Sequence, residues 1–225
     1  MNNPTLSQDR RDFLGGMAAA TVAAVGLGAL APAAGAAEAA AAAGTDFVRW
    51  LDTISGKYKQ LYDAPAANHG LPLVWSHVFL LTGAPGYGVA ESELGVVVVL
   101  RHSAIPLAMG DAVWAKYKLG EYLDIADPAT KAPATRNPYA HIKPGDMPFP
   151  EAALEKLVAR GVKFAVCGAA IGFHSAHIAQ RQGLAADAVK QDLLAAVLPG
   201  VQVVPSGVLA VNGAQSRGCA YCFAG

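Results

Sequence analysis

The fold is decided by the run Gly95-Val96-Val97-Val98-Val99-Leu100, an uninterrupted apolar stretch rich in β-branched residues. Such a run is typical of a strand that helices cover on both faces of a parallel sheet, because neither face then needs polar side chains. Further strands are predicted at residues 57–62, 163–166, 201–204 and 220–223. Strands that alternate with helices through short turns indicate βαβ units. The sequence therefore predicts a single α/β domain with a mostly parallel sheet and helices on both faces.

The helices are predicted from apolar residues at helical spacing and from the Gly and Pro residues that end them. They are expected at residues 45–55, 71–81, 104–119, 151–160, 169–182, 186–197 and 208–216. The segment 71–81 also alternates enough to pass for a strand, and a turn is expected at Gly83–Gly88. Residues 124–150 are rich in Pro and Asp with little periodicity, which predicts a long insertion or a lid.

The first 43 residues are expected to lie outside the domain. Arg10-Arg11, followed by Phe13-Leu14 and a weakly apolar run rich in Gly and Ala, is typical of a twin-arginine (Tat) export signal. A retained anchor is the alternative, but a spanning helix needs about 20 strongly apolar residues, and this run is interrupted by glycines. We therefore expect a Tat signal peptide and Ala-rich linker at 1–43, a domain at 44–225, and a periplasmic protein that the Tat translocase exports folded.

Composition excludes some partners and directs attention to the cysteines. The chain has 17 Lys and Arg against 17 Asp and Glu, so its formal net charge is zero and no nucleic-acid partner is expected. Export would place Cys167, Cys219 and Cys222 in an oxidising compartment, where thiols form disulfides unless they are protected or used as reactive groups. Because three is odd, at least one thiol has no partner within the chain.

Cys167 is the first candidate for chemistry because it directly follows a predicted buried strand. Ligands and reactive groups gather at the carboxyl ends of strands in open α/β sheets. The next helix is predicted to begin just beyond Gly168, so its unpaired N–H groups and positive dipole end would favour a thiolate. A buried and inert cysteine is the equal alternative from position alone.

Arg101 and His102 follow the strand at 95–100 and should lie at the same edge as Cys167. His102 is a candidate proton donor or acceptor for the thiol, or the positive partner of its thiolate. Arg101 is a candidate contact for an anionic sulfur compound such as thiosulfate. The alternatives are a histidine that caps loop carbonyls and an arginine in a surface salt bridge.

Cys219-Ala220-Tyr221-Cys222 is a CxxC in a predicted terminal strand. Residues three apart in an extended strand point to opposite faces, so a disulfide here needs a turn. The alternatives, in order, are a tight redox disulfide, two ordinary small residues, or half of a metal site. His174 and His177, three apart on one helical face, would complete a Cys2His2 zinc set or line the thiol site. Apart from this metal alternative, no cofactor is expected.

Several segments together resemble the DsrE/DsrF-like family in order and spacing. They are Gly161-Val162-Lys163-Phe164-Ala165-Val166-Cys167-Gly168, Leu198-Pro199-Gly200-Val201-Gln202-Val203-Val204-Pro205-Ser206-Gly207-Val208, Gly218-Cys219-Ala220-Tyr221, and residues 96–105 with His102 directly after the strand. The resemblance covers most of residues 57–223 but not the insertion. The CxxC departs from the family pattern, in which an aromatic residue is more usual at its first position.

The resemblance implies a five-stranded, mainly parallel sheet, assembly into homo-oligomers and, in sulfur-relay members, a persulfide-carrying cysteine that matches Cys167. It also places Asp63, at the end of the first strand, near the site. Many members have no assigned reaction, and the sulfur-relay members work in the cytoplasm.

Two functional hypotheses follow, and the sequence leaves open whether the protein is an enzyme. The first is an exported DsrE-like protein that handles sulfane sulfur or thiol redox through Cys167, with small sulfur species or a sulfur-carrier protein as partner. The second is a noncatalytic periplasmic binding or oligomeric assembly module whose cysteines are structural. Thiol accessibility separates the two, because a relay cysteine must be reachable near neutral pH.

Overall fold

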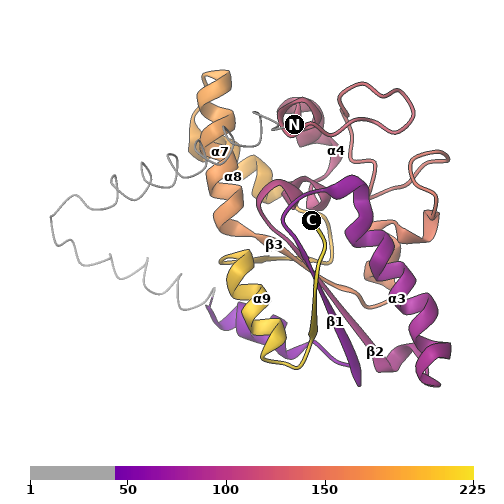
Figure 1. The fold of residues 1–225 in the computed structure, drawn as a ribbon. Helices are drawn as coiled ribbons and strands as arrows, with labels where there is room; N and C mark the ends of the chain where they lie inside the picture. Colours follow the sequence, from indigo (N-terminus) through magenta and orange to yellow (C-terminus); the bar gives the residue numbers. More distant parts are fainter. Residues whose placement is uncertain (1–43) are drawn as a thin grey trace, which may run out of the picture. The chain divides into compact units, whose positions relative to one another are not determined.

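In the computed structural model, residues 44–225 are described, and the predicted Tat signal lies outside them. Five strands form one sheet in the order β4-β3-β2-β1-β5, and every neighbouring pair is parallel. The strands are β1 (Tyr58–Ala64), β2 (Leu94–Leu100), β3 (Lys163–Cys167), β4 (Val201–Val204) and β5 (Ala220–Phe223) (Figure 1). The expected α/β domain is confirmed, and its sheet is parallel throughout.

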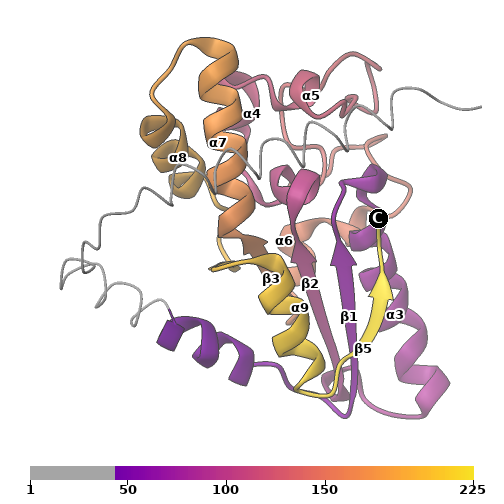
Figure 2. The same cartoon turned by 60° about the vertical axis from the view of Figure 1, so that its left-hand side comes forward.

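Helices cover both faces of the sheet, as the valine run predicts. Val96 and Val98 of β2 point into a core shared with α3 (Leu71–Tyr87), α6 (Leu154–Ala159) and α7 (Gly168–Gln182), against which α8 (Ala186–Ala195) packs. Val97 and Val99 point into a second core under α9 (Gly207–Gln215) and the helix at residues 44–52. Figures 1 and 2 show α9 and α3 on opposite sides of β1 and β2. No helix within residues 44–225 is long and apolar enough to cross a membrane.

The prediction of one continuous helix at residues 104–119 is wrong. The expected helix at 104–119 is instead a 3-10 helix, η3 (His102–Ala108), followed by the short helices α4 (Asp111–Lys116) and α5 (Leu119–Tyr122). Pro106 has no N–H to donate, and Lys118 lies in the left-handed region with φ of 50° between α4 and α5. Both features break a continuous helix.

The turn expected at Gly83–Gly88 is also wrong, because α3 continues through Tyr87. Gly83 serves close packing, since a Cβ there would lie 2.9 Å from a Leu94 methyl group. The helix ends only at Gly88, whose φ of 65° suits a left-handed helix cap. Similarly, β1 runs on through Asp63 to Ala64, two residues beyond the predicted end, which leaves Asp63 inside the sheet.

The insertion at residues 124–150 is fastened to η3. Asn137 is 2% exposed, and its side-chain amide donates to the carbonyls of Leu107 at 3.0 Å and Met109 at 2.8 Å. The Asn137 Oδ1 accepts from the backbone N–H of Tyr139 at 2.9 Å. These bonds satisfy backbone groups at the end of η3 and in the insertion that have no partner in a helix or a sheet. An irregular segment is ordered only where its buried backbone groups find such partners.

Candidate functional site

The candidate site lies where the path of the chain reverses across the sheet. After β3 the chain enters α7 on one face, whereas after the neighbouring strand β4 it enters α9 on the other face. In open α/β sheets, a crevice for ligands opens at the carboxyl ends of two such strands. Cys167, the last residue of β3, is paired with Val204, the last residue of β4. The structure therefore places Cys167 at this reversal.

Cys167 caps the amino end of α7. Its side chain is 6% exposed, and its Sγ accepts a hydrogen bond from the backbone N–H of Ala170 at 3.3 Å. An N–H group and the positive end of a helix dipole both stabilise a sulfur that carries negative charge. Beside it, Gly168 allows α7 to begin against β4, because a Cβ there would lie 2.9 Å from the Val204 carbonyl oxygen.

Arg101 is held at the same edge by a bidentate ion pair with Asp63. Arg101 Nε donates to Asp63 Oδ1 at 2.6 Å, and Nη2 donates to Oδ2 at 3.0 Å. Asp63 is 3% exposed and also accepts from the Tyr221 hydroxyl at 2.9 Å. On the α9 side, Gly207 leaves room for Arg101, since a Cβ there would lie 2.5 Å from the Arg101 Cβ.

The charge of Arg101 is coupled to its neighbours. The hydrogen bond with Asp63 raises the pKa of Arg101 above its ordinary value, and the Cys167 thiolate acts in the same direction at longer range. Arg101 therefore lies within electrostatic reach of Cys167. The sequence-predicted residues Asp63, Arg101 and Cys167 are brought together at one edge.

His102 leaves β2 in the left-handed region, with φ of 47°. Its ring lies against that of His174, with the ring centroids 5.9 Å apart. Partial burial lowers the pKa of His102 below its ordinary value, and the nearby positive charge of Arg101 lowers it further. His102 therefore lies beside a second histidine, and its pKa is lowered by burial and by Arg101.

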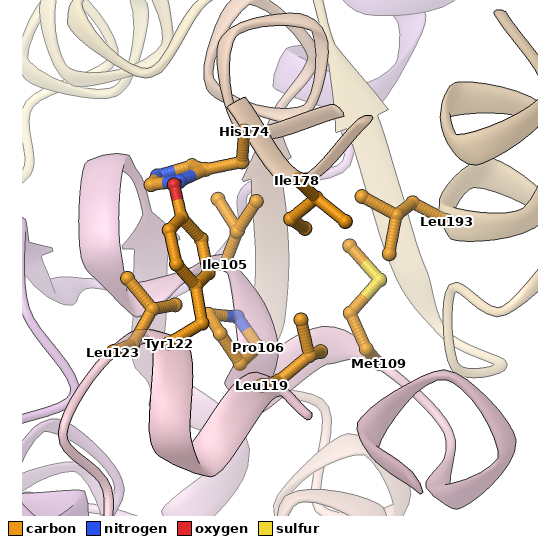
Figure 3. Close-up of a pocket in the computed structure, with 9 residues that line it drawn as sticks. All are labelled: Ile105, Pro106, Met109, Leu119, Tyr122, Leu123, His174, Ile178 and Leu193. Carbon is orange, nitrogen blue, oxygen red and sulfur yellow. The ribbon is translucent and has the colours of Figure 1, made fainter. Parts of the chain in front are cut away.

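His174 lies on α7, and its side chain is buried against η3 and α5. Its Nε2 lies 3.2 Å from the backbone oxygen of His102, and its Nδ1 lies 2.8 Å from the Tyr122 hydroxyl (Figure 3). His177, one turn further along α7, is exposed and packs edge-on against the Tyr122 ring. The described contacts of His174 therefore lead to His102 and Tyr122.

A cavity borders Tyr122 and His174, but its volume is only about 10 Å³. Its other walls are apolar, as Figure 3 shows; they are Ile105, Pro106, Met109, Leu119, Leu123, Ile178 and Leu193. A cavity of this size is about the minimum for a single water molecule. It is therefore a packing defect of the core and not a pocket for a substrate.

The two cysteines of the CxxC lie on opposite faces of the sheet. Cys219 is buried in the core under α9, whereas Cys222 packs against the other core. All three cysteines have free thiols, and burial raises the pKa of Cys219. A disulfide between Cys219 and Cys222 would require β5 to leave its extended conformation, in agreement with the expectation from strand geometry.

The two cysteines of the CxxC also lie at different levels along the sheet. Cys222 is paired with Tyr62 in the middle of β1, and Cys219 precedes β5 near the amino edge of the sheet. Among residues 44–225, no group of three or more His, Cys, Asp or Glu is placed to hold a metal ion. The Cys2His2 set of His174, His177, Cys219 and Cys222 is thus not assembled in this structure.

Two tyrosines of the site were not identified as functional from the sequence. Tyr221 reaches Asp63 from β5, and Tyr122 reaches His174 from α5. Each contact joins residues that are far apart in the chain. The alternation of β5 does indicate that Tyr221 shares a face with Cys219, but only the pairing of β5 with β1 brings it to Asp63.

The fold and these contacts define an α/β protein with a helix-capping cysteine and a partly buried ion pair at the carboxyl edge of an all-parallel sheet. Comparisons with models of protein families, with curated proteins and with solved structures give no match for this chain. The likeness to the DsrE/DsrF-like family remains a resemblance carried by the sequence segments quoted above.

Proposed function

We propose that the protein is an exported DsrE-like carrier of sulfane sulfur, with Cys167 as the residue that accepts the sulfur atom. The observation that carries this proposal is the environment of Cys167: its Sγ receives the Ala170 N–H at the start of α7, and Arg101 lies within electrostatic reach. Cysteine reacts as the thiolate, and an N–H donor and a guanidinium are groups suited to hold a sulfur atom that bears negative charge.

The chemistry is a thiolate attack on a sulfur–sulfur bond. With thiosulfate, the Cys167 thiolate forms a bond to the outer sulfur, the sulfur–sulfur bond of thiosulfate breaks, and sulfite leaves with the electron pair. The product is a Cys167 persulfide anion, so the total charge is conserved. Arg101 would attract the anionic sulfur donor. His102 would accept the proton of the Cys167 thiol or return a proton to it.

The burial of Cys167 restricts the donor. At 6% exposure, Cys167 presents little of its surface to solvent. A small sulfur species reaches so buried a residue more readily than a protein surface does.

The alternative is a noncatalytic assembly module with structural cysteines. Two observations favour it: the same burial of Cys167, and the edge strand β5, which has no charged residue and exposes Tyr221 and Phe223. Uncharged edge strands with exposed aromatic residues are suited to contacts with another chain. A homo-oligomer is compatible with both functions.

The test is the intact mass of the folded mature protein before and after treatment with polysulfide or thiosulfate. We expect a gain of one sulfur atom that a reductant reverses. Cys167→Ala should abolish the gain, whereas Cys219→Ala and Cys222→Ala, the matched controls, should retain it. An unchanged mass, together with a Cys167 that resists alkylation until the protein unfolds, would favour the assembly module.

The proposed export has its own test. Replacing both Arg10 and Arg11 with Lys keeps the charge but removes the arginine pair of the signal. We expect the variant to accumulate in the cytoplasm, as measured by cell fractionation, while Lys at Arg49 leaves export intact. Equal export of the two variants would contradict the Tat assignment.

A further inference from the structure

The contacts of His174 determine which of its ring nitrogens carries the proton. Its Nε2 lies 3.2 Å from the backbone oxygen of His102, and a carbonyl oxygen can only accept a hydrogen bond. The proton therefore lies on Nε2. The neutral ring then has a bare Nδ1, which accepts from the Tyr122 hydroxyl at 2.8 Å.

This arrangement is stable near neutral pH. His174 is 3% exposed, and burial lowers its pKa to about 4, so the ring remains neutral. Burial also raises the pKa of Tyr122 to about 12, so its hydroxyl keeps the proton that it donates. Both partners thus hold the protonation states that the two hydrogen bonds require.

The carbonyl that His174 binds belongs to a residue with a strained backbone, His102. His102 has φ of 47°, a left-handed conformation that is uncommon for a residue with a Cβ and that costs free energy unless its surroundings stabilise it. Its carbonyl is held by His174, and the two rings are 5.9 Å apart. Immediately before it, Arg101 donates its backbone N–H to the Ala64 oxygen at 3.0 Å. The turn at His102 therefore determines the direction of the backbone directly after Arg101, at the end of β2.

We propose that His174, in the Nε2–H tautomer with the Tyr122 hydroxyl on its other nitrogen, is a positioning residue that holds the left-handed turn at His102 and so keeps Arg101 and His102 at the edge with Cys167. An apolar residue would fill the buried site but would remove the hydrogen bond from the imidazole to the His102 carbonyl. The assignment of the tautomer is independent of the proposed function. The consequence for Cys167 rests on that function.

The tautomer is tested by ¹⁵N NMR of the histidine rings in the folded protein at pH 7. We expect His174 to show a protonated Nε2 and a bare Nδ1. In Tyr122→Phe, which removes only the hydroxyl, the Nδ1 resonance should shift because it loses its donor, while the proton should stay on Nε2, where the His102 carbonyl accepts it. A proton on Nδ1 in the native protein, or a positively charged ring, would overturn the proposal.

The positioning role is tested by two substitutions of matched size. His174→Gln keeps an N–H donor where Nε2 lies, whereas His174→Leu removes the donor and keeps the bulk. We expect His174→Leu to shift the NMR titration of His102 and to slow the alkylation of Cys167 by roughly 3- to 10-fold, with a changed pH profile. His174→Gln should remain within about twofold of the native protein, as should His177→Leu, the control on the same helix.

The outcomes separate this inference from the proposed function. Equal effects of Leu and Gln at position 174 on the His102 titration would show that the donor has no positioning role. If His174→Leu does not fold, the same His102 titration is read in His174→Met, which also lacks the donor, and an unchanged value there would contradict the proposal. If Cys167 takes up no sulfur while the NMR results hold, the proposed function fails and the positioning role stands.

Discussion

At the scale of single residues, Asp63 is the centre of charge of the site. Its carboxylate is almost fully buried, and it accepts two hydrogen bonds from Arg101 and one from Tyr221. A buried carboxylate is tolerated only where such partners replace its hydration. Because β1 lies between β2 and β5, it is the strand from which one side chain can meet partners on both neighbours.

We predict that Asp63→Asn lowers the free energy of unfolding by about 3 kcal/mol, because it leaves the Arg101 guanidinium without its buried counter-charge. Tyr221→Phe, which removes a single hydrogen bond, should cost about 1 kcal/mol. Urea unfolding measures both. Asp52→Asn breaks an exposed ion pair with Arg217 and serves as the control, with an expected loss below about 1 kcal/mol. Equal losses in Asp63→Asn and Asp52→Asn would contradict the central role of Asp63.

At the scale of elements, the insertion and η3 stabilise one another through Asn137. We predict that Asn137→Ala lowers the free energy of unfolding by about 2 kcal/mol, because buried carbonyls of η3 lose their donor and the Tyr139 N–H loses its acceptor. Thr135→Ala, at an exposed position of the same insertion, should change it by less than about 0.5 kcal/mol. Thermal and urea unfolding of the two variants give the comparison, and similar stabilities would show that the insertion is only loosely attached.

The elements that the sequence predicts well are those whose signal is local. The valine run of β2 is β-branched and apolar at every position, which by itself predicts a strand buried on both faces. This prediction does not depend on contacts with distant residues. The stretch from Ala104 to Leu119 has helical spacing, but Pro106 and the bonds from Asn137, thirty residues away, impose a 3-10 helix. Such distant contacts override local periodicity and cannot be read from it.

The same distinction between local signals and distant contacts applies to the site. Because parallel strands end at one edge, residues that follow strands are expected together, and Arg101 and Cys167 do lie together. The partner of Asp63 on β5 depends on the strand order, which the sequence does not specify. The bond between His174 and Tyr122 depends on the short helix α5, whereas the predicted helix ended at Leu119. The bond to His102 depends on the left-handed turn after β2.

At the scale of the whole molecule, buried and paired ionisable groups make stability depend on pH. His174 has a pKa of about 4 in the folded protein against 6.5 as its ordinary value. Below pH 6.5 the unfolded chain therefore binds a proton that the native protein does not, which favours unfolding. Burial also lowers the pKa values of His77 and His102, so their contributions have the same sign.

Carboxylates add a second, more acidic transition. Backbone hydrogen bonds from Thr130 and Ala129 and the charge of Arg136 lower the pKa of Asp127. Burial opposes ionisation of Asp146, but hydrogen bonds from Arg136 and the Lys143 N–H outweigh it and lower its pKa. A carboxylate with a lowered pKa stabilises the fold above its unfolded value of 3.8, and this stability is lost as the pH falls below that value.

We predict that the free energy of unfolding falls as the pH is lowered from about 6.5 to 4, with a contribution from His174 of about 3 kcal/mol across this range. Urea unfolding at pH 7, 6, 5 and 4 measures the slope. In His174→Gln, which has no titrating ring, the slope should become shallower by about 1.4 kcal/mol per pH unit, whereas His177→Gln, at an exposed position of the same helix, should retain it. If both variants keep the native slope, His174 is protonated in the folded protein or lies exposed to solvent, and the hydrogen bonds that hold His102 are not those of the neutral ring.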